Sequence, residues 1–214
     1  MNPLGIFGGT FDPIHYGHLR TAFELLQAVP LAEVRFVPAG NPPHRAAPRC
    51  DARDRLAMVE AAVADQPGFT VDARELDRDG PSYTVTTLRE LRAEDPGRPL
   101  CLIVGMDAFL GLPTWHEWRA ILDLAHLVVA HRPGWSAPRE GLLAELLAQR
   151  GAAAAELRAS PAGRIHVRAV TPLEISSTDL RDLIVAGRDP RYLVPDAVRA
   201  LIAESGCYHV PAQR

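Results

Sequence analysis

The chain has 214 residues, of which 47% are hydrophobic and 23% are charged, a composition typical of a globular domain and not of a disordered or fibrous chain. Its formal net charge of −3 argues against a broad basic surface for nucleic acid and leaves room only for a focused anion pocket. We therefore expect a single domain over residues 1–214 that binds small molecules.

Apolar segments of strand length alternate along the chain with segments of helical periodicity. The predicted strands lie at 4–7, 34–39, 69–73, 100–105, 126–131 and 165–170, and the predicted helices at 19–29, 52–65, 83–94, 141–159, 177–187 and 194–206. The alanine-rich run within 151–157 is predicted to continue its helix on the solvent side. This alternation favours an α/β fold with a doubly wound parallel sheet, whose ligands bind beyond the carboxyl ends of the strands.

The cysteines and the amino-terminal residues indicate a cytoplasmic protein. Cys50, Cys101 and Cys207 are odd in number and widely spaced, so we expect reduced thiols and neither a disulfide framework nor a thiolate metal site. The start of the chain has no basic segment followed by a long apolar one, and no apolar run approaches the ~20 residues that span a bilayer. We therefore expect no membrane association.

The segment GGTFDPIHYGH, residues 8–18, lies where the first strand turns into the first helix. Gly8 and Gly9 leave backbone N–H groups open to an anion such as phosphate. His15 and His18 are three residues apart and project to one side of the helix start. The glycines also suit the geometry of such a junction, and HxxH is half of a metal site, but no third or fourth ligand has comparable placement.

A second segment, ISSTDLR at residues 175–181, begins a later helix. Ser176 and Asp179 form a capping pair ahead of the apolar residues. The simple interpretation is a good helix cap. The functional interpretation adds that the N–H groups of Ser177 and Thr178 bind phosphates at the positive end of the helix dipole, with Arg181 beside them.

Together these two segments resemble the (T/S)FDPxHxGH and ISSTxxR motifs of the HxGH nucleotidyltransferase superfamily. The blocks between them, among them PAGNPPHR, PSYTVTTL, VGMDAF and LPTWHEW, are similar to bacterial nicotinate-nucleotide adenylyltransferases. The resemblance covers nearly the whole chain. It implies a Rossmann-like fold in which residues 175–214 carry the second motif and a small C-terminal helical part, and an enzyme that transfers AMP from ATP to nicotinate mononucleotide, producing nicotinate adenine dinucleotide and pyrophosphate.

The resemblance also implies the residues of the ATP half of the site. His18, His15 and Arg181 are the predicted catalytic residues. The predicted ATP-binding residues are Gly8, Gly9, Thr10, Phe11, His15, His18, Gly105, Asp107, Ile175, Ser177, Thr178 and Arg181. No protein ligands for a metal are predicted, because Mg²⁺ is expected to bind with the ATP phosphates and mostly water.

On the acceptor half, the resemblance assigns nicotinate mononucleotide to Arg45, Thr84, Val85, Trp115, His116 and Arg132. Trp115 would stack on the pyridine ring from a loop after a strand, and backbone groups of Thr84 and Val85 would bind the carboxylate. Many relatives have lysine where this chain has Arg45, and often aspartate where it has Thr86. Arginine keeps the charge of that lysine but changes its geometry. The change from aspartate to threonine leaves the contacts of the substrate loop open.

Three alternatives to this function share part of the pattern. Pantetheine-phosphate adenylyltransferases carry both nucleotide motifs but are usually shorter and lack a PTWHEW block. A non-catalytic nucleotide sensor on the same fold would have little reason to keep both histidines and Arg181. An aminoacyl-tRNA synthetase fragment would need a KMSKS-like stretch and a basic surface, which this chain lacks. The sequence leaves open whether the protein forms a homo-oligomer and how strongly it prefers the acid over the amide.

Overall fold

The computed structural model describes residues 1–42, 47–131 and 137–208. Its centre is a six-stranded sheet in the order β3-β2-β1-β4-β5-β6, and every neighbouring pair is parallel. The strands are β1 (Leu4–Gly9), β2 (Glu33–Pro38), β3 (Phe69–Val71), β4 (Leu100–Gly105), β5 (His126–His131) and β6 (Ile165–Ala169). The predicted doubly wound parallel sheet is confirmed.

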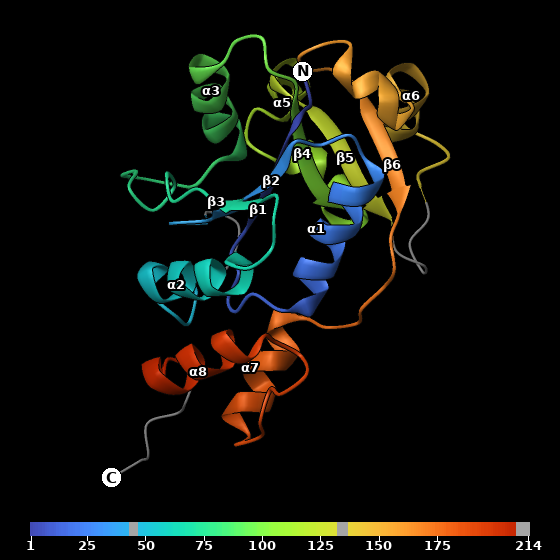
Figure 1. Cartoon of the computed structure of the whole chain (residues 1–214). Helices are drawn as coiled ribbons and strands as arrows, with labels where there is room; N and C mark the ends of the chain where they lie inside the picture. Colours follow the sequence, from blue (N-terminus) through green and yellow to red (C-terminus); the bar gives the residue numbers. More distant parts are fainter. Residues whose placement is uncertain (43–46, 132–136, 209–214) are drawn as a thin grey trace.

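Helices cover both faces of this sheet (Figure 1). The α-helices are α1 (Tyr16–Ala28), α2 (Ala52–Val63), α3 (Thr84–Glu94), α4 (Met106–Leu110), α5 (Trp118–Leu124), α6 (Leu142–Arg150), α7 (Ser177–Val185) and α8 (Asp196–Ser205); η1 (Leu112–Thr114) and η2 (Ala154–Arg158) are 3₁₀ turns. Within the described ranges, no helix is long and apolar enough to cross a membrane.

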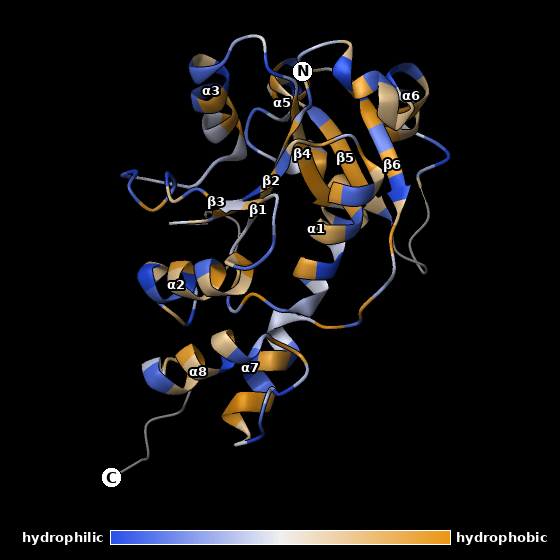
Figure 2. Ribbon diagram, in the orientation of Figure 1, coloured by the Kyte–Doolittle hydropathy of each residue, from blue (hydrophilic) through white to orange (hydrophobic). Residues whose placement is uncertain are grey.

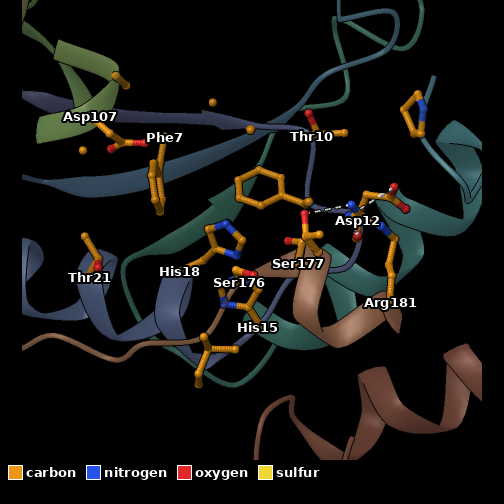
Figure 3. Close-up of a pocket in the computed structure, with 18 of the residues that line it drawn as sticks. Phe7, Thr10, Asp12, His15, His18, Thr21, Asp107, Ser176, Ser177 and Arg181 are labelled. Carbon is orange, nitrogen blue, oxygen red and sulfur yellow. Dashed lines mark hydrogen bonds and ion pairs between the residues drawn. The ribbon is translucent and has the colours of Figure 1, made fainter. Parts of the chain in front are cut away.

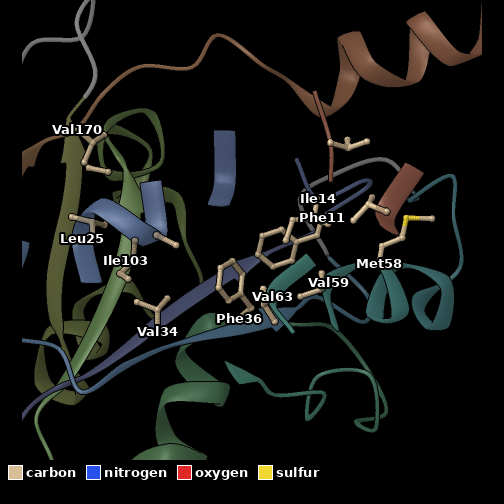
Figure 4. Close-up of a cluster of buried hydrophobic side chains, with 14 of the residues drawn as sticks. Phe11, Ile14, Leu25, Val34, Phe36, Met58, Val59, Val63, Ile103 and Val170 are labelled. Carbon is tan, nitrogen blue, oxygen red and sulfur yellow. The ribbon is translucent and has the colours of Figure 1, made fainter. Parts of the chain in front are cut away.

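The two faces of the sheet have separate hydrophobic cores because strand side chains alternate. On β4, Cys101 and Ile103 point into one core, and Leu100, Leu102 and Val104 into the other. The first core receives α1, α2, α7 and α8 and is shown in Figure 4; the second receives α3, α4, α5 and α6. Figure 2 shows the inner strands β4 and β5 as largely hydrophobic, as expected for strands covered on both faces.

The strand order reverses between β1 and β4. From β1 the chain continues outward through β2 to β3, and it then returns to β4 on the other side of β1 before continuing to β5 and β6. In open parallel sheets the carboxyl ends of two such strands border a crevice that binds ligands. Here those ends are Gly9 and Gly105.

The alanine-rich run does not form the predicted helix. The helix α6 ends at Arg150, and Gly151 instead forms a parallel β-bridge with Ile165, where the Ala152 N–H also donates to the Ile165 carbonyl at 2.9 Å. The chain then turns through η2, whose Leu157 is completely buried. The prediction was wrong because pairing with β6 and burial of Leu157 outweigh the helical preference of alanine.

The prediction of reduced thiols is also wrong for two of the three cysteines. Cys50 and Cys207 are joined as a disulfide, with Cα atoms 5.2 Å apart although 157 residues separate them in sequence. Packing of α8 against α2 brings these segments together. Cys101 is free and buried, and burial raises the pKa of its thiol to about 12.

Candidate active site

A cavity of about 730 Å³ opens at the carboxyl ends of β1 and β4 (Figure 3). Every residue predicted to bind ATP lines it: Gly8, Gly9, Thr10, Phe11, His15, His18, Gly105, Asp107, Ile175, Ser177, Thr178 and Arg181. The first motif approaches from β1 and the start of α1, and the second from α7. Two segments about 160 residues apart therefore share one cavity, as the sequence predicted.

His15 caps the first helix with its own ring. Its Nδ1 accepts a hydrogen bond from the Gly17 N–H at 3.1 Å, so the ring proton of the neutral imidazole lies on Nε2. The His18 ring stacks on it with a centroid separation of 3.8 Å. A side chain on Gly17 would come within 2.9 Å of the His15 Nδ1, so glycine is needed at that position. The HxGH pattern thus fixes the tautomer of His15 and the placement of both rings.

The turn before this helix has an unusual backbone. Phe11 has a φ of 47°, in the left-handed region that residues with side chains rarely occupy. Its buried ring lies over Gly9, where an added Cβ would come within 2.9 Å of the ring atoms. Gly9 therefore permits the turn, and the turn places the backbone of Gly9 and Thr10 on the cavity wall.

The second motif is joined to the first by hydrogen bonds. Ser176 caps α7 by accepting from the Asp179 N–H at 3.1 Å, which confirms the predicted capping pair. The Ser177 hydroxyl donates to the Pro13 carbonyl at 3.1 Å. Arg181 donates to the Asp12 carbonyl at 2.8 Å and to the Thr178 hydroxyl at 3.1 Å.

Asp12 is a buried residue of the cavity wall that the sequence did not single out. Its carboxylate is 5% exposed and accepts from the N–H groups of Arg49 and Cys50 and from the Tyr208 hydroxyl, at 2.9, 3.2 and 2.8 Å. Burial and this carboxylate both raise the pKa of Tyr208 well above its ordinary value. Asp12 thereby connects the turn between β1 and α1 (residues 10–15) to the loop before α2 and to the segment after α8. Its place inside the first motif was the available signal, whereas nothing in the sequence pointed to Tyr208.

Most predicted acceptor residues lie outside this cavity. Trp115 follows η1 and is half-buried against the second core, and the exposed His116 stacks on Tyr83 with centroids 4.2 Å apart. Thr84 and Val85 begin α3 directly after Tyr83, and the Val85 side chain is fully buried, which leaves only its backbone to meet a ligand. The structure therefore brings these two segments together.

Two details of the acceptor half differ from the prediction or lie beyond it. Trp115 is not in a loop that directly follows a strand, because α4 and η1 separate it from β4. The compact Met106–Leu110 turn of helix forms there because a buried Met106 and Phe109 pack into the second core. Arg45 and Arg132 lie outside the described residues.

The start of the loop that contains Arg45 is held against the segment before α3. The Ser82 hydroxyl accepts from the N–H groups of Gly40 and Asn41, each at 3.0 Å. Gly40 packs so closely on the Glu75 backbone that an added Cβ would lie 2.1 Å from the Glu75 carbonyl oxygen. The Glu75 carboxyl accepts from the Thr87 hydroxyl, and burial raises its pKa.

The donor set of the cavity suits a metal ion carried by the phosphates. Its acidic lining residues are Asp12 and Asp107, and the Asp12 oxygens already accept the protein donors described above. Among the described residues, the one group of three side chains of metal-ligating type is Cys50, Asp54 and Cys207; it lies outside the cavity lining, and its two cysteines are joined as a disulfide. Asp107 alone is too few protein ligands for a dedicated cage, whereas Mg²⁺ commonly keeps several waters beside substrate phosphates.

The comparison with protein families first defines the class. The cytidylyltransferase-like family matches residues 6–183, a range that includes both motifs, most of β1 and the other five strands of the sheet. A solved structure, the nicotinic acid mononucleotide adenylyltransferase of Plasmodium falciparum complexed with NaAD, superposes with a TM-score of 0.75 over 97% of this chain and 98% of that one. At 14% identity, this likeness shows the fold.

Closer relatives identify the family within this class. A protein of Aeromonas hydrophila named "Probable nicotinate-nucleotide adenylyltransferase" is 53% identical over 207 residues, covering 96% of this chain and 97% of its own. A protein of the same name from Halorhodospira halophila is 53% identical over 212 residues, covering 99% and 97%. The chain belongs to the nicotinate-nucleotide adenylyltransferase family.

Proposed function

We propose that this protein transfers the AMP group of ATP to nicotinate mononucleotide, forming nicotinate adenine dinucleotide and pyrophosphate. The observation that carries the proposal is the convergence of both phosphate-binding segments on one cavity, where Arg181 of α7 bonds the Asp12 carbonyl of the first turn. The 53% identity to proteins named as probable nicotinate-nucleotide adenylyltransferases, over nearly the full length of this chain, supports the choice of acceptor.

The reaction needs no general base. The attacking group is a phosphate monoester, whose second pKa is about 6, so it is largely ionised at neutral pH. One of its oxygens bonds to the α-phosphorus of ATP while the bond from that phosphorus to the bridging oxygen breaks, and the electron pair leaves with pyrophosphate. Catalysis then consists of aligning two anions and stabilising the charge that develops.

The ATP half of the site supplies donors for this charge. His15 would act at the triphosphate, and we assign His18, whose ring stacks on it, to the α-phosphate. Gly9 and Thr10 line the same cavity, and their backbone N–H groups would complete the phosphate site. At the start of α7, Ser177, Thr178 and Arg181 would bind the β- and γ-phosphates that become pyrophosphate.

Other residues would orient the two substrates. Gly105, at the end of β4, and Asp107, in α4, line the cavity where the adenosine ribose is proposed to bind. Trp115, His116 and the start of α3 would bind the pyridine ring and its carboxylate, and Arg45 and Arg132 the mononucleotide phosphate. Mg²⁺ would enter with ATP and neutralise phosphate charge.

Steady-state assays of pyrophosphate release test this function. Purified enzyme is given ATP and Mg²⁺ with nicotinate mononucleotide, nicotinamide mononucleotide or phosphopantetheine. We expect the highest kcat/KM with nicotinate mononucleotide. A preference for phosphopantetheine would identify the rival enzyme, and ATP binding without turnover of any acceptor would identify a sensor. The location of the reaction in the cytoplasm stays a prediction.

A further inference from the structure

Arg55 is a buried cation that the proposed mechanism does not use. It lies in the first turn of α2 and is 1% exposed. Burial lowers the pKa of its guanidinium, and the nearby Asp12 carboxylate opposes this shift. An arginine in a protein nonetheless stays protonated, so its buried N–H groups need acceptors.

Its three hydrogen bonds go to backbone carbonyls in two different substrate loops. Nη1 donates to Thr10 at 2.6 Å, Nε to Cys50 at 3.3 Å and Nη2 to Gly40 at 3.4 Å. Thr10 belongs to the turn between β1 and α1 (residues 10–15), which we call the phosphate turn. Gly40 and Cys50 bracket the loop that contains Arg45, the residue assigned to the acceptor phosphate. One planar guanidinium thus connects the phosphate turn to both ends of the acceptor loop, which runs from Gly40 to Cys50.

The bond to Thr10 is placed where the turn most needs support. The Thr10 carbonyl belongs to the peptide that enters Phe11, the residue with a φ of 47°. Such a backbone conformation persists only where its surroundings hold it. Arg55 holds the peptide before Phe11, and the buried Asp12 carboxylate, bonded to the N–H groups of Arg49 and Cys50, holds the residue after it.

We propose that Arg55 is a positioning residue that aligns the phosphate turn with the acceptor loop. In-line transfer requires the acceptor phosphate to face the α-phosphorus at bonding distance, and a misplacement of about 1 Å costs about 10²-fold in rate. Loss of these three hydrogen bonds would therefore lower kcat more than it weakens the binding of either substrate. This inference rests on the proposed function, because it assigns the loop between Gly40 and Cys50 to the acceptor.

Arg92 provides a matched control within the same chain. It is also a helical arginine whose burial lowers its pKa, and it donates to the carbonyls of Asp95, Pro96, Arg98, Leu124 and Pro161. These carbonyls surround the starts of β4 and β5, at the edge of the sheet opposite the cavity. Arg92 therefore fastens backbone segments as Arg55 does, but away from both substrates.

The test compares Arg55→Lys with Arg92→Lys. A lysine keeps the charge but cannot donate to three carbonyls in the fixed fork of a guanidinium. Both variants are melted and assayed below their transitions, with functional sites counted by titration with a non-hydrolysable ATP analogue. We expect both to lose thermal stability. We expect kcat per functional site to fall about 10- to 100-fold for Arg55→Lys, with each KM changed far less, and to stay within about twofold for Arg92→Lys.

Each outcome decides the question. Unchanged kcat in folded Arg55→Lys, or an equal fall in Arg92→Lys, would overturn the proposal. If Arg55→Lys does not fold, Arg55→Gln, which removes the buried charge and retains amide donors, is used instead; failure of both beside a folded Arg92→Lys would make Arg55 a folding residue only. If the wild-type enzyme prefers another acceptor, the proposed function fails, and the kcat comparison with that acceptor still tests the role of Arg55.

Discussion

The two predicted halves of the site are built in different ways. The ATP half consists of short contiguous segments at strand ends and helix starts, and every residue predicted for it lines one cavity. The acceptor half draws on separate loops: its described residues lie at the start of α3 and after η1, joined by the stacking of His116 on Tyr83. The predicted ATP residues thus come mainly from two contiguous motifs, whereas the predicted acceptor residues come from segments that are distant in the sequence.

This difference suggests a division between chemistry and specificity. Backbone donors at a strand-helix junction bind any triphosphate of suitable shape, so many proteins of this class can share them. The predicted acceptor residues lie mostly in connecting segments, which vary more between proteins. Substitutions in the ATP half should therefore lower turnover, and those in the acceptor half should change which mononucleotide binds and how tightly.

The largest effect is expected for His18 in the ATP half. His18→Ala should lower kcat by about 10²- to 10³-fold, because the lost donor acts on charge that develops in the transition state. The His18 ring also contacts Phe11 and Phe7, with centroids 5.2 and 6.2 Å away. His18→Phe therefore serves as a control that keeps an aromatic ring without its donor. Near-normal kcat in either folded variant would remove His18 from the mechanism.

A smaller effect, confined to one substrate, is expected for Arg181. Arg181→Ala should lower kcat/KM for ATP by about 10- to 100-fold, in line with about 1.5 to 3 kcal/mol for a hydrogen bond to a charged group. The KM for the mononucleotide should change much less. Arg188→Ala, which removes an exposed arginine just after α7, is the matched control. If only the KM for the mononucleotide changed, the assignment of the second motif to the triphosphate would be wrong.

Trp115 tests the acceptor half in the same way. Trp115→Ala should raise the KM for nicotinate mononucleotide several-fold, because an aromatic pair contributes about 0.5 to 1.5 kcal/mol, and Trp115→Phe should lose less. The KM for ATP should barely move. Trp118→Ala is the control, since Trp118 packs on the same core and beneath Arg119, 4.6 Å from its ring centroid. A destabilised Trp115→Ala with an unaltered KM per folded molecule would mean that Trp115 only packs.

The smallest effect concerns the support of the acceptor loop. Because burial raises the pKa of Glu75, the folded state binds this proton more tightly than the unfolded state, whose glutamate pKa is about 4.3. Stability should therefore fall as pH rises from about 4.3 through the raised pKa. Thermal melts across this range should show that component in the wild type and not in Glu75→Gln. Parallel melting curves for the two proteins would contradict the assignment.

The fold and the two motifs that meet in the cavity could be predicted because their signals are local. Strand and helix periods are properties of neighbouring residues, and the capping pair Ser176 and Asp179 spans three positions. The partners of Asp12 could not be predicted, because the contacts to Arg49, Cys50 and Tyr208 depend on how distant segments pack. The Cys50–Cys207 pair was missed for the same reason. The alanine run failed in the opposite sense, because local preference gave way to pairing with β6.

The contact between Asp12 and Tyr208 also affects the order in which a new chain can finish its site. The two residues are 196 positions apart, so the turn that contains Asp12 leaves the ribosome well before the residue whose buried hydroxyl donates to it. Chains are made at about 5 to 20 residues per second, which separates the two events by many seconds at the slower rate. During translation the sheet can assemble strand by strand, yet the support of its nucleotide turn is completed only when synthesis has reached Tyr208.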